Sequence, residues 1–339
     1  MHIALDAMGG DHGPEELIGG ALLAVKQSSL QVTLVGNRQI LQAHLDRLRP
    51  DDIGSSQIQI VHAAEVVEMG ESPVDAIRRK KDSSVLVAFE LVRQGLADAA
   101  VSAGNSGATM AAAVRKLGRM EHVSRPGIAS IFPTLKKPVV MMDVGANVDC
   151  RPQHLFQFAV MASAFSHIFD IDHPRIGLLS IGEEVGKGNT LVKETYARLA
   201  ASSLNFVGNV EGRDVFQGDV DVIICDGFVG NICLKLSEGL AGAAMQMLKD
   251  EIMKSTAAKI GYFLARPAFR AFAKRVDYAD YGGAPLLGVN GIGIICHGKS
   301  SAEAIKNAIL EAAKMVEKQV NQRITEGLAA NAQDEEAVS

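Results

Sequence analysis

The sequence lacks the features that mark secreted, membrane-spanning or nucleic-acid-binding chains. Its 339 residues carry 34 Lys and Arg against 39 Asp and Glu, so no basic excess indicates a nucleic-acid partner. No apolar run reaches the roughly 18 residues that a membrane-spanning helix needs. The four cysteines are scattered, without a CxxC pair or the spacing of a metal site. We therefore expect a reduced, cytoplasmic chain without disulfides.

Several common catalytic motifs are also missing. The chain has no GxSxG elbow, no zinc signature and no GxGxxG after its first strand. Residues 182–189, GEEVGKGN, resemble a Walker A loop, but the spacing is one residue short and no Ser or Thr follows the lysine. These absences argue against a nucleotide triphosphatase and a standard dinucleotide site. We expect chemistry without a metal, a cofactor or a covalent nucleophile.

What is present is a regular alternation of short apolar strands and helices, in a chain that is 47% apolar. It opens on a strand at 3–5, which argues against a signal peptide, and continues with a helix over 14–27. The alternation predicts a doubly wound, mostly parallel, Rossmann-like α/β fold in which 127–132 and 138–142 form an antiparallel pair. We expect one catalytic domain over 1–325, closed by a helix at 301–321. A frayed tail is expected over 326–339.

Glycine-rich turns punctuate this alternation. Residues 220–240 read as a buried strand, the turn DGFVGN and a helix, which is the unit that aims free N–H groups at an anion. Similar turns occur at 102–108, 143–149, 180–189 and 296–301. Because ligands of such folds bind beyond the carboxyl ends of the strands, the turns predict one phosphate-sized site at one sheet edge.

Each polar candidate in these turns also has a plain structural interpretation. Lys187 sits in a glycine loop before a helix, where it either holds a phosphate or is a solvated loop lysine. Asn231 either binds a ligand carbonyl or caps its helix, and His297 either faces the site or ends a strand. Asp6 and Asp143 both end strands and as a pair could bind a metal, but no third ligand is spaced to support this.

Residues 254–275 form a second informative stretch. They carry six basic residues and no acidic one, interleaved with apolar and aromatic side chains. Pro267 suggests a bend between two short helices, giving a projecting helical hairpin. Apolar bulk flanked by Lys and Arg is typical of a helix lying in a membrane interface, and it would equally suit docking of an acidic protein. The alternative is packing on a second subunit.

The motifs together resemble those of one family. ALDAMGGDHGP, SAGNSGA, DVGANVD, GKGN, CDGFVGN and YGGAPLLGVNG occur in this order between residue 1 and about 322, and they closely resemble the PlsX family of bacterial phosphate acyltransferases. The resemblance implies transfer of an acyl group from acyl-(acyl carrier protein) to inorganic phosphate, on a fold similar to the phosphotransacetylase and isocitrate dehydrogenase group. It also implies a homodimer that associates peripherally with the membrane. A downstream acyltransferase would use the acyl phosphate.

The combined prediction assigns residues to roles. Lys187 and Asn231 are the predicted catalytic residues, for direct attack of phosphate on the thioester without an acyl-enzyme. The predicted substrate-binding residues are Ser102, Gly104, Asn105, Ser106, Gly107, Asp143, Asn147, Gly186, Asn189, Asp226, Gly227, Gly230, His297 and Lys299. The predicted carrier-protein or membrane contacts are Lys259, Phe263, Leu264, Arg266, Arg270 and Lys274.

Two other functions stay open on the sequence. One is a phosphotransacetylase-like or NAD-linked enzyme on the same fold, which would depend on coenzyme A or a dinucleotide. The other is a non-enzymatic membrane scaffold, which would not require so many glycine turns. Acyl-chain preference, the dimer surface and the order of substrate binding are not predicted.

Overall fold

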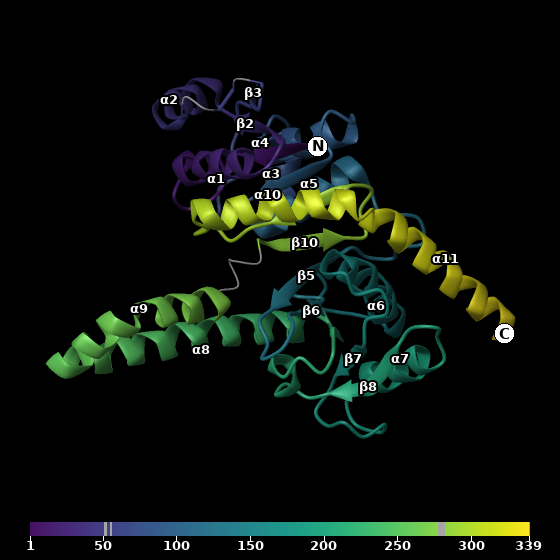
Figure 1. Ribbon diagram of the computed structural model, residues 1–339. Helices are drawn as coiled ribbons and strands as arrows, with labels where there is room; N and C mark the ends of the chain where they lie inside the picture. The colour runs from purple at the N-terminus through teal and green to yellow at the C-terminus, as the bar shows by residue number, and fades with distance from the viewer. Residues whose placement is uncertain (51–52, 55, 277–281, 339) are drawn as a thin grey trace.

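The computed structural model describes residues 1–50, 53–54, 56–276 and 282–338; for 273–276 and 332–338 it describes the backbone alone. The chain forms one 11-stranded sheet with helices on both faces (Figure 1). The strand order is β3-β2-β1-β4-β11-β10-β5-β6-β9-β7-β8, and most neighbours are parallel. The predicted mostly parallel α/β fold is confirmed.

The strands are β1 (His2–Asp6), β2 (Gln31–Gly36), β3 (Ile58–His62), β4 (Ala99–Ser102), β5 (Gly127–Phe132), β6 (Val139–Met142), β7 (Ile176–Leu179), β8 (Phe206–Val210), β9 (Val222–Ile224), β10 (Ala284–Leu287) and β11 (Ile292–Ile295). The helices are α1 (Pro14–Gln27), α2 (Arg38–Leu48), α3 (Pro73–Arg79), α4 (Ser84–Arg93), α5 (Ser106–Leu117), α6 (Pro152–Ser166), α7 (Thr190–Ala200), α8 (Gly227–Lys254), α9 (Thr256–Val276), α10 (Ala302–Glu317) and α11 (Val320–Val338). Short 3₁₀ turns, η1 and η2, span His167–Phe169 and Asp214–Phe216.

Each face of the sheet carries its own hydrophobic core. One core packs α1, α2, α6, α7, α10 and α11 on the sheet and includes Phe158 and Phe165. The other packs α3, α4, α5 and the start of α8, and includes Phe89. Because both faces are covered, the central strands are buried along their whole length, which explains their continuous apolar runs.

Three antiparallel strand pairings decide where the loops lie. The predicted antiparallel pairing of β5 with β6 is confirmed. In addition, β10 runs antiparallel to both β11 and β5. The carboxyl ends of β1, β4 and β11 therefore lie at one edge of the sheet, and those of β6, β9 and β7 lie at the opposite edge. The expectation that all the glycine turns meet at one edge is wrong.

The helical hairpin differs from its prediction. It consists of α8 and α9, which project together from the body (Figure 1). The chain turns at Ser255, which is extended, whereas Pro267 lies inside the continuous helix α9. The predicted bend into two short helices at Pro267 is wrong, because an interior proline removes one hydrogen bond and bends a helix without having to end it.

The carboxyl-terminal segment is also more ordered than predicted. The expected helix over 301–321 is divided into α10 and α11 at Gln319, which has a φ of 53°. Val320, Ile324 and Leu328 are buried, so α11 presents an apolar row at four-residue spacing. Asn331 is buried as well and donates to the carbonyl of Gly327. The prediction of a frayed tail from 326 is therefore wrong for residues 326–331.

Candidate active site

The main cavity lies on the face of the sheet that carries α5 and α8, and its volume is about 550 Å³. Its lining includes members of five glycine-rich turns that lie far apart in the sequence: 102–108, 143–149, 226–231, 282–285 and 296–301. The polar and glycine lining residues are Ser106, Gly107, Ser130, Gly145, Asn231, Lys235, Glu238, Gly282, Gly283, His297, Lys299, Ser300 and Ser301. The apolar ones include Met110, Ile128, Ile131, Val144, Ala146, Leu234, Ala284, Ile295 and Cys296.

Helix α5 forms one wall and presents its first turn to the cavity. Ser106 and Gly107 line the cavity, and the amides of a first helical turn lack intrahelical partners. Asn105 does not line it: its Oδ1 accepts from the amide of Ala108 at 3.0 Å, and its Nδ2 donates to the carbonyl of Met69 at 2.9 Å. Asn105 therefore caps and anchors the helix, and the anion-binding capacity of this wall lies in the backbone.

Ser102 and Gly104 hold the loop before α5 in place through hydrogen bonds. The buried Ser102 hydroxyl donates to Asp6 Oδ2 at 2.8 Å and accepts from the Gly104 amide at 3.2 Å. A side chain on Gly104 would meet that hydroxyl at 3.3 Å. Burial raises the pKa of Asp6. These residues join the ends of β1 and β4 and do not line the cavity.

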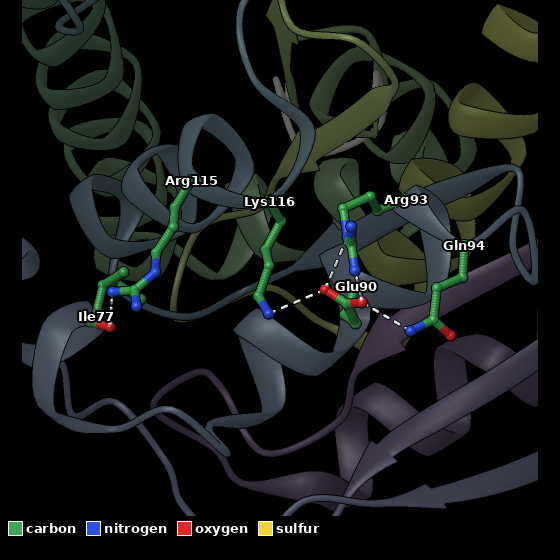
Figure 2. Close-up of polar contacts among 6 residues, drawn as sticks. All are labelled: Ile77, Glu90, Arg93, Gln94, Arg115 and Lys116. Carbon is green, nitrogen blue, oxygen red and sulfur yellow. Dashed lines mark hydrogen bonds and ion pairs between the residues drawn. The ribbon is translucent and has the colours of Figure 1, made fainter.

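The far end of α5 is tied to the neighbouring helices (Figure 2). Arg115 donates to the carbonyl of Ile77 at 2.9 Å, and Lys116 pairs with Glu90 of α4 at 3.0 Å. Arg93 also hydrogen-bonds to Glu90. Hydrogen bonds from Arg93 and Lys116 lower the pKa of Glu90 to about 2. These contacts fix the axis of α5 and so the direction of its first turn.

Helix α8 forms the opposite wall and depends on two glycines. Its start is capped by Asp226, whose Oδ1 accepts from the amide of Val229 at 2.9 Å. A Cβ on Gly227 would lie 2.7 Å from the carbonyl oxygen of Asn147, and one on Gly230 would overlap the carbonyl oxygen of Asp143. The glycines therefore permit the close approach of α8 to the 143–149 loop.

This approach places Asn231 on the cavity. A Cβ on Gly145, which has a φ of 110°, would lie 3.5 Å from Asn231 Oδ1. Asp226 supplies the helix cap, so the Asn231 side chain is not used for that purpose. It is exposed at the cavity wall and free to meet a ligand. The alternative interpretation of Asn231 as a cap is wrong.

Asp143 and Asn147 organise the loop behind Asn231. Asp143 is fully buried and accepts hydrogen bonds from the amides of Ile128 at 3.0 Å and Asn147 at 2.7 Å. The Asn147 side chain donates to Asp143 at 2.9 Å and to the carbonyl of Pro126 at 2.8 Å. Burial raises the pKa of Asp143. Both residues shape the site without lining it.

Asp6 and Asp143 do not form a pair. They end strands at opposite edges of the sheet, because β6 runs against the direction of β1. Within the described part of the chain, no three His, Cys, Asp or Glu side chains gather as metal ligands would. The interpretation of these two aspartates as a joint site is therefore wrong.

The loop after β11 brings a histidine and a lysine to the cavity. His297 and Lys299 are exposed and line it. The Lys299 amide donates to His297 Nδ1 at 3.1 Å, so the neutral ring carries its proton on Nε2. The Gly298 carbonyl accepts from the amide of Asp11 at 2.7 Å, which ties the opening glycine loop to this one. Lys299 thus lines the cavity from a loop that this hydrogen bond holds in place.

The 182–189 loop lies outside the cavity. Lys187 is exposed, is not a lining residue, and has its Nζ 3.9 Å from Glu184. The Asn189 side chain accepts from the amide of Val192 at 2.9 Å and caps α7. A Cβ on Gly186 would meet nothing within 4 Å. The structure therefore does not bring Lys187, Gly186 or Asn189 together with the other predicted residues.

Two groups were not predicted, one lining the cavity and one behind its lining. Lys235 and Glu238 form an ion pair at 2.9 Å on the face of α8 that carries Asn231, and the spacing 231, 235, 238 is the signal that could have found them. Glu311 of α10 lies beneath the Gly282–Gly283 turn, and burial raises its pKa well above the ordinary value. The signal that could have found it is its position on the buried face of α10, three residues after Ala308 and four before Met315.

The predicted surface contacts lie on α9, in the projecting hairpin (Figure 1). Lys259, Phe263, Leu264, Arg266 and Arg270 are all exposed, with Phe263 at 71% and Leu264 at 74%. The side chain of Lys274 falls outside the described residues. None of the helices in the described ranges combines the length and hydrophobicity needed to cross a membrane.

Comparison with known proteins identifies the family. The family described as "Fatty acid synthesis protein" matches residues 1–323. A phosphate acyltransferase of Nitratidesulfovibrio vulgaris is 54% identical over 97% of this chain and 95% of its own length. One of Geobacter sulfurreducens is 52% identical over 96% of this chain and 94% of its own length.

Solved structures agree on the fold. EutD phosphotransacetylase from Staphylococcus aureus superposes with a TM-score of 0.62 at 18% identity, covering 93% of this chain and 94% of that one. A phosphotransacetylase from Streptococcus pyogenes gives 0.62 at 19% identity, covering 94% of each. The predicted similarity to phosphotransacetylases is confirmed at the level of fold. With the near-full-length matches in sequence, it follows that the chain is an acyltransferase belonging to the phosphate acyltransferase (PlsX) family of fatty acid synthesis proteins.

Proposed function

We propose that the chain transfers a fatty acyl group from acyl-(acyl carrier protein) to inorganic phosphate, giving acyl phosphate for phospholipid synthesis. The observation that carries this proposal is a single cavity that joins a helix amino terminus, a lysine and an asparagine to an apolar floor. Such a cavity suits a small anion together with an acyl group. Phosphate is already a good nucleophile and a thioester has a good leaving group, so positioning and charge stabilisation suffice.

Phosphate would bind at the α5 wall. The amides of Ser106 and Gly107 lie in the first turn of a 12-residue helix, whose dipole favours an anion. Lys299 lines the same cavity and supplies a positive charge. We assign to Lys299 the role that the sequence suggested for Lys187, because Lys187 is outside the cavity.

The thioester would lie against the α8 wall. The Asn231 amide donates to the carbonyl oxygen, which becomes an oxyanion when a phosphate oxygen attacks the carbonyl carbon. The carbon–sulfur bond then breaks, and the leaving thiolate of the carrier protein takes up the proton that the attacking hydrogen phosphate loses. One preorganised donor of this kind contributes on the order of 10²-fold or more in rate. The step requires no acyl-enzyme.

The test is phosphate-dependent release of free thiol from palmitoyl-(acyl carrier protein) in the presence of EDTA. We expect release only with phosphate, with acyl phosphate as the product. Release from acyl-coenzyme A but not from the carrier protein would replace the proposal with a phosphotransacetylase-like reaction. Release that EDTA abolishes would contradict a metal-free reaction.

We also propose that the hairpin docks the chain on its partners. Its basic, aromatic helix α9 suits an anionic membrane surface and the acidic carrier protein. The exposed apolar residues of α8, including Leu236 and Leu240, suit packing against the second subunit of a homodimer. If vesicle binding survives the double change Phe263→Asp and Leu264→Asp, membrane docking by α9 is wrong.

A further inference from the structure

The cavity has an apolar floor that the polar chemistry does not use. Its apolar lining residues Met110, Val144, Leu234 and Ile295 also belong to the hydrophobic core on the α5 side of the sheet or pack against it. Between α5 and α8 the cavity therefore opens directly onto that core. Water in such a space lacks polar partners, so an apolar group gains by replacing it.

Helices α5 and α8 share one arrangement at this floor. On α5, Met110 follows Ser106 by four residues, and on α8, Leu234 follows Asn231 by three. Residues at these spacings lie on the same side of a helix. Each wall thus pairs a polar residue with a large apolar residue one turn further along, and both apolar residues are half-buried and contact the cavity.

We infer that Met110 and Leu234 determine acyl-chain specificity by gripping the part of the chain nearest the thioester. This inference rests on the proposed function and names the subsite for the acyl group. An acyl thioester has a carbonyl group that accepts hydrogen bonds and a chain that is apolar. These two parts match the polar walls and the apolar floor of the cavity.

The size of the cavity suits the reacting end of an acyl thioester. Its volume of about 550 Å³ falls within the range of roughly 300 to 1,000 Å³ that is typical of small-molecule sites. Such a volume accommodates a phosphate and a thioester together with the first carbons of an acyl chain, and these carbons would lie against the apolar floor.

The test compares two substrates, the hexadecanoyl and acetyl thioesters of acyl carrier protein, by kcat/KM for phosphate-dependent thiol release. Each buried methylene contributes about 0.8 kcal/mol, or roughly fourfold. Leu234→Phe and Met110→Phe narrow the floor and should displace at least two methylenes of the long chain. We expect the ratio of hexadecanoyl to acetyl activity to fall roughly tenfold or more, because the acetyl group has no methylene to displace.

Leu96→Phe is the matched control. Leu96 lies in the loop before β4, is 56% exposed and does not line the cavity, so the ratio should stay within about twofold of the wild type. If Leu234→Phe or Met110→Phe fails to fold, Leu234→Ala tests the inference instead. This change widens the floor of the cavity, so it should raise kcat/KM for a methyl-branched acyl thioester relative to the straight-chain thioester. Active variants of both kinds with the wild-type chain preference would overturn the inference. An inactive wild type on both thioesters would instead overturn the proposed function.

Discussion

Two glycine-rich turns of this protein look alike in sequence and differ in structure. Both stretches, 226–231 and 182–189, follow a buried strand and contain the Asp or Asn side chain that caps a helix. The 226–231 stretch forms the start of α8, whereas the 182–189 turn precedes α7. In the first, Gly227 and Gly230 let the helix approach the 143–149 loop so closely that no side chain would fit. In the second, Gly186 meets nothing within 4 Å.

The difference teaches how to interpret such turns. Glycine in an exposed turn provides backbone freedom, whereas glycine at a contact between two backbones decides where the next side chain points. Asn231 faces the cavity because of such a contact, and Lys187 lies outside the cavity in an open loop. Paired substitutions in the two turns test this distinction.

The largest effect is expected at the asparagines. Asn231→Ala removes the proposed oxyanion donor and should lower kcat by about 10² to 10³ while the protein stays folded. Asn189→Ala removes only a helix cap, so it should cost about 1 kcal/mol of stability and leave kcat within about twofold. Steady-state kinetics and thermal unfolding measure both. Equal kinetic losses would remove the distinction between the turns.

The next largest difference is expected between substitutions of the glycines in the two turns. Gly230→Ala places a methyl group against the Asp143 carbonyl, and we expect a loss of about 2 to 3 kcal/mol in the free energy of unfolding, with reduced activity. Gly186→Ala should change stability by less than about 0.5 kcal/mol. Denaturant unfolding of the two variants compares them. A stable, active Gly230→Ala protein would contradict the close approach.

Substitution of each of the two lysines tests which of them binds phosphate. A charge-assisted hydrogen bond contributes about 1.5 to 3 kcal/mol, so Lys299→Ala should raise the KM for phosphate about tenfold or more. Lys187→Ala should leave that KM within about twofold. Phosphate titrations at fixed thioester concentration measure both. The reverse result would show that the 182–189 loop delivers Lys187 to the bound phosphate, as the sequence suggested.

The smallest effect, on stability, is expected for a substitution that weakens the anchoring of the α5 wall. Its anchor Glu90 has a pKa lowered to about 2 by Arg93 and Lys116 (Figure 2). A lowered carboxyl pKa gives stability that is present above the unfolded value near 4.3 and is lost as pH falls toward 2. Glu90→Gln should therefore cost about 1 kcal/mol at pH 7 and less at pH 3. Thermal unfolding at the two pH values checks this, and an equal loss at both would contradict the ion-pair origin.

The local structure was largely predictable from the sequence. The predicted range 14–27 coincides with α1, because a proline starts this helix and the apolar spacing defines its extent. The antiparallel β5–β6 pair followed from its short connection. Beyond 321 the chain remains helical as α11, because packing of this helix on α6, with Leu328 buried, outweighs the acidic, alanine-rich composition there.

The site was predictable as a set of turns but not as an arrangement. Composition and motif order determined the fold class, the family and most of the turns that line the cavity. Which turns meet was decided by strand direction: β10 and β6 reverse the sheet, so α5 and α8 enter one face from opposite edges and enclose the cavity between them. Strand direction depends on pairings between residues far apart in the chain, such as Leu286 with Ile128, which no local pattern encodes. For the same reason only the tertiary structure could show that Asn231 lines the cavity and Lys187 does not.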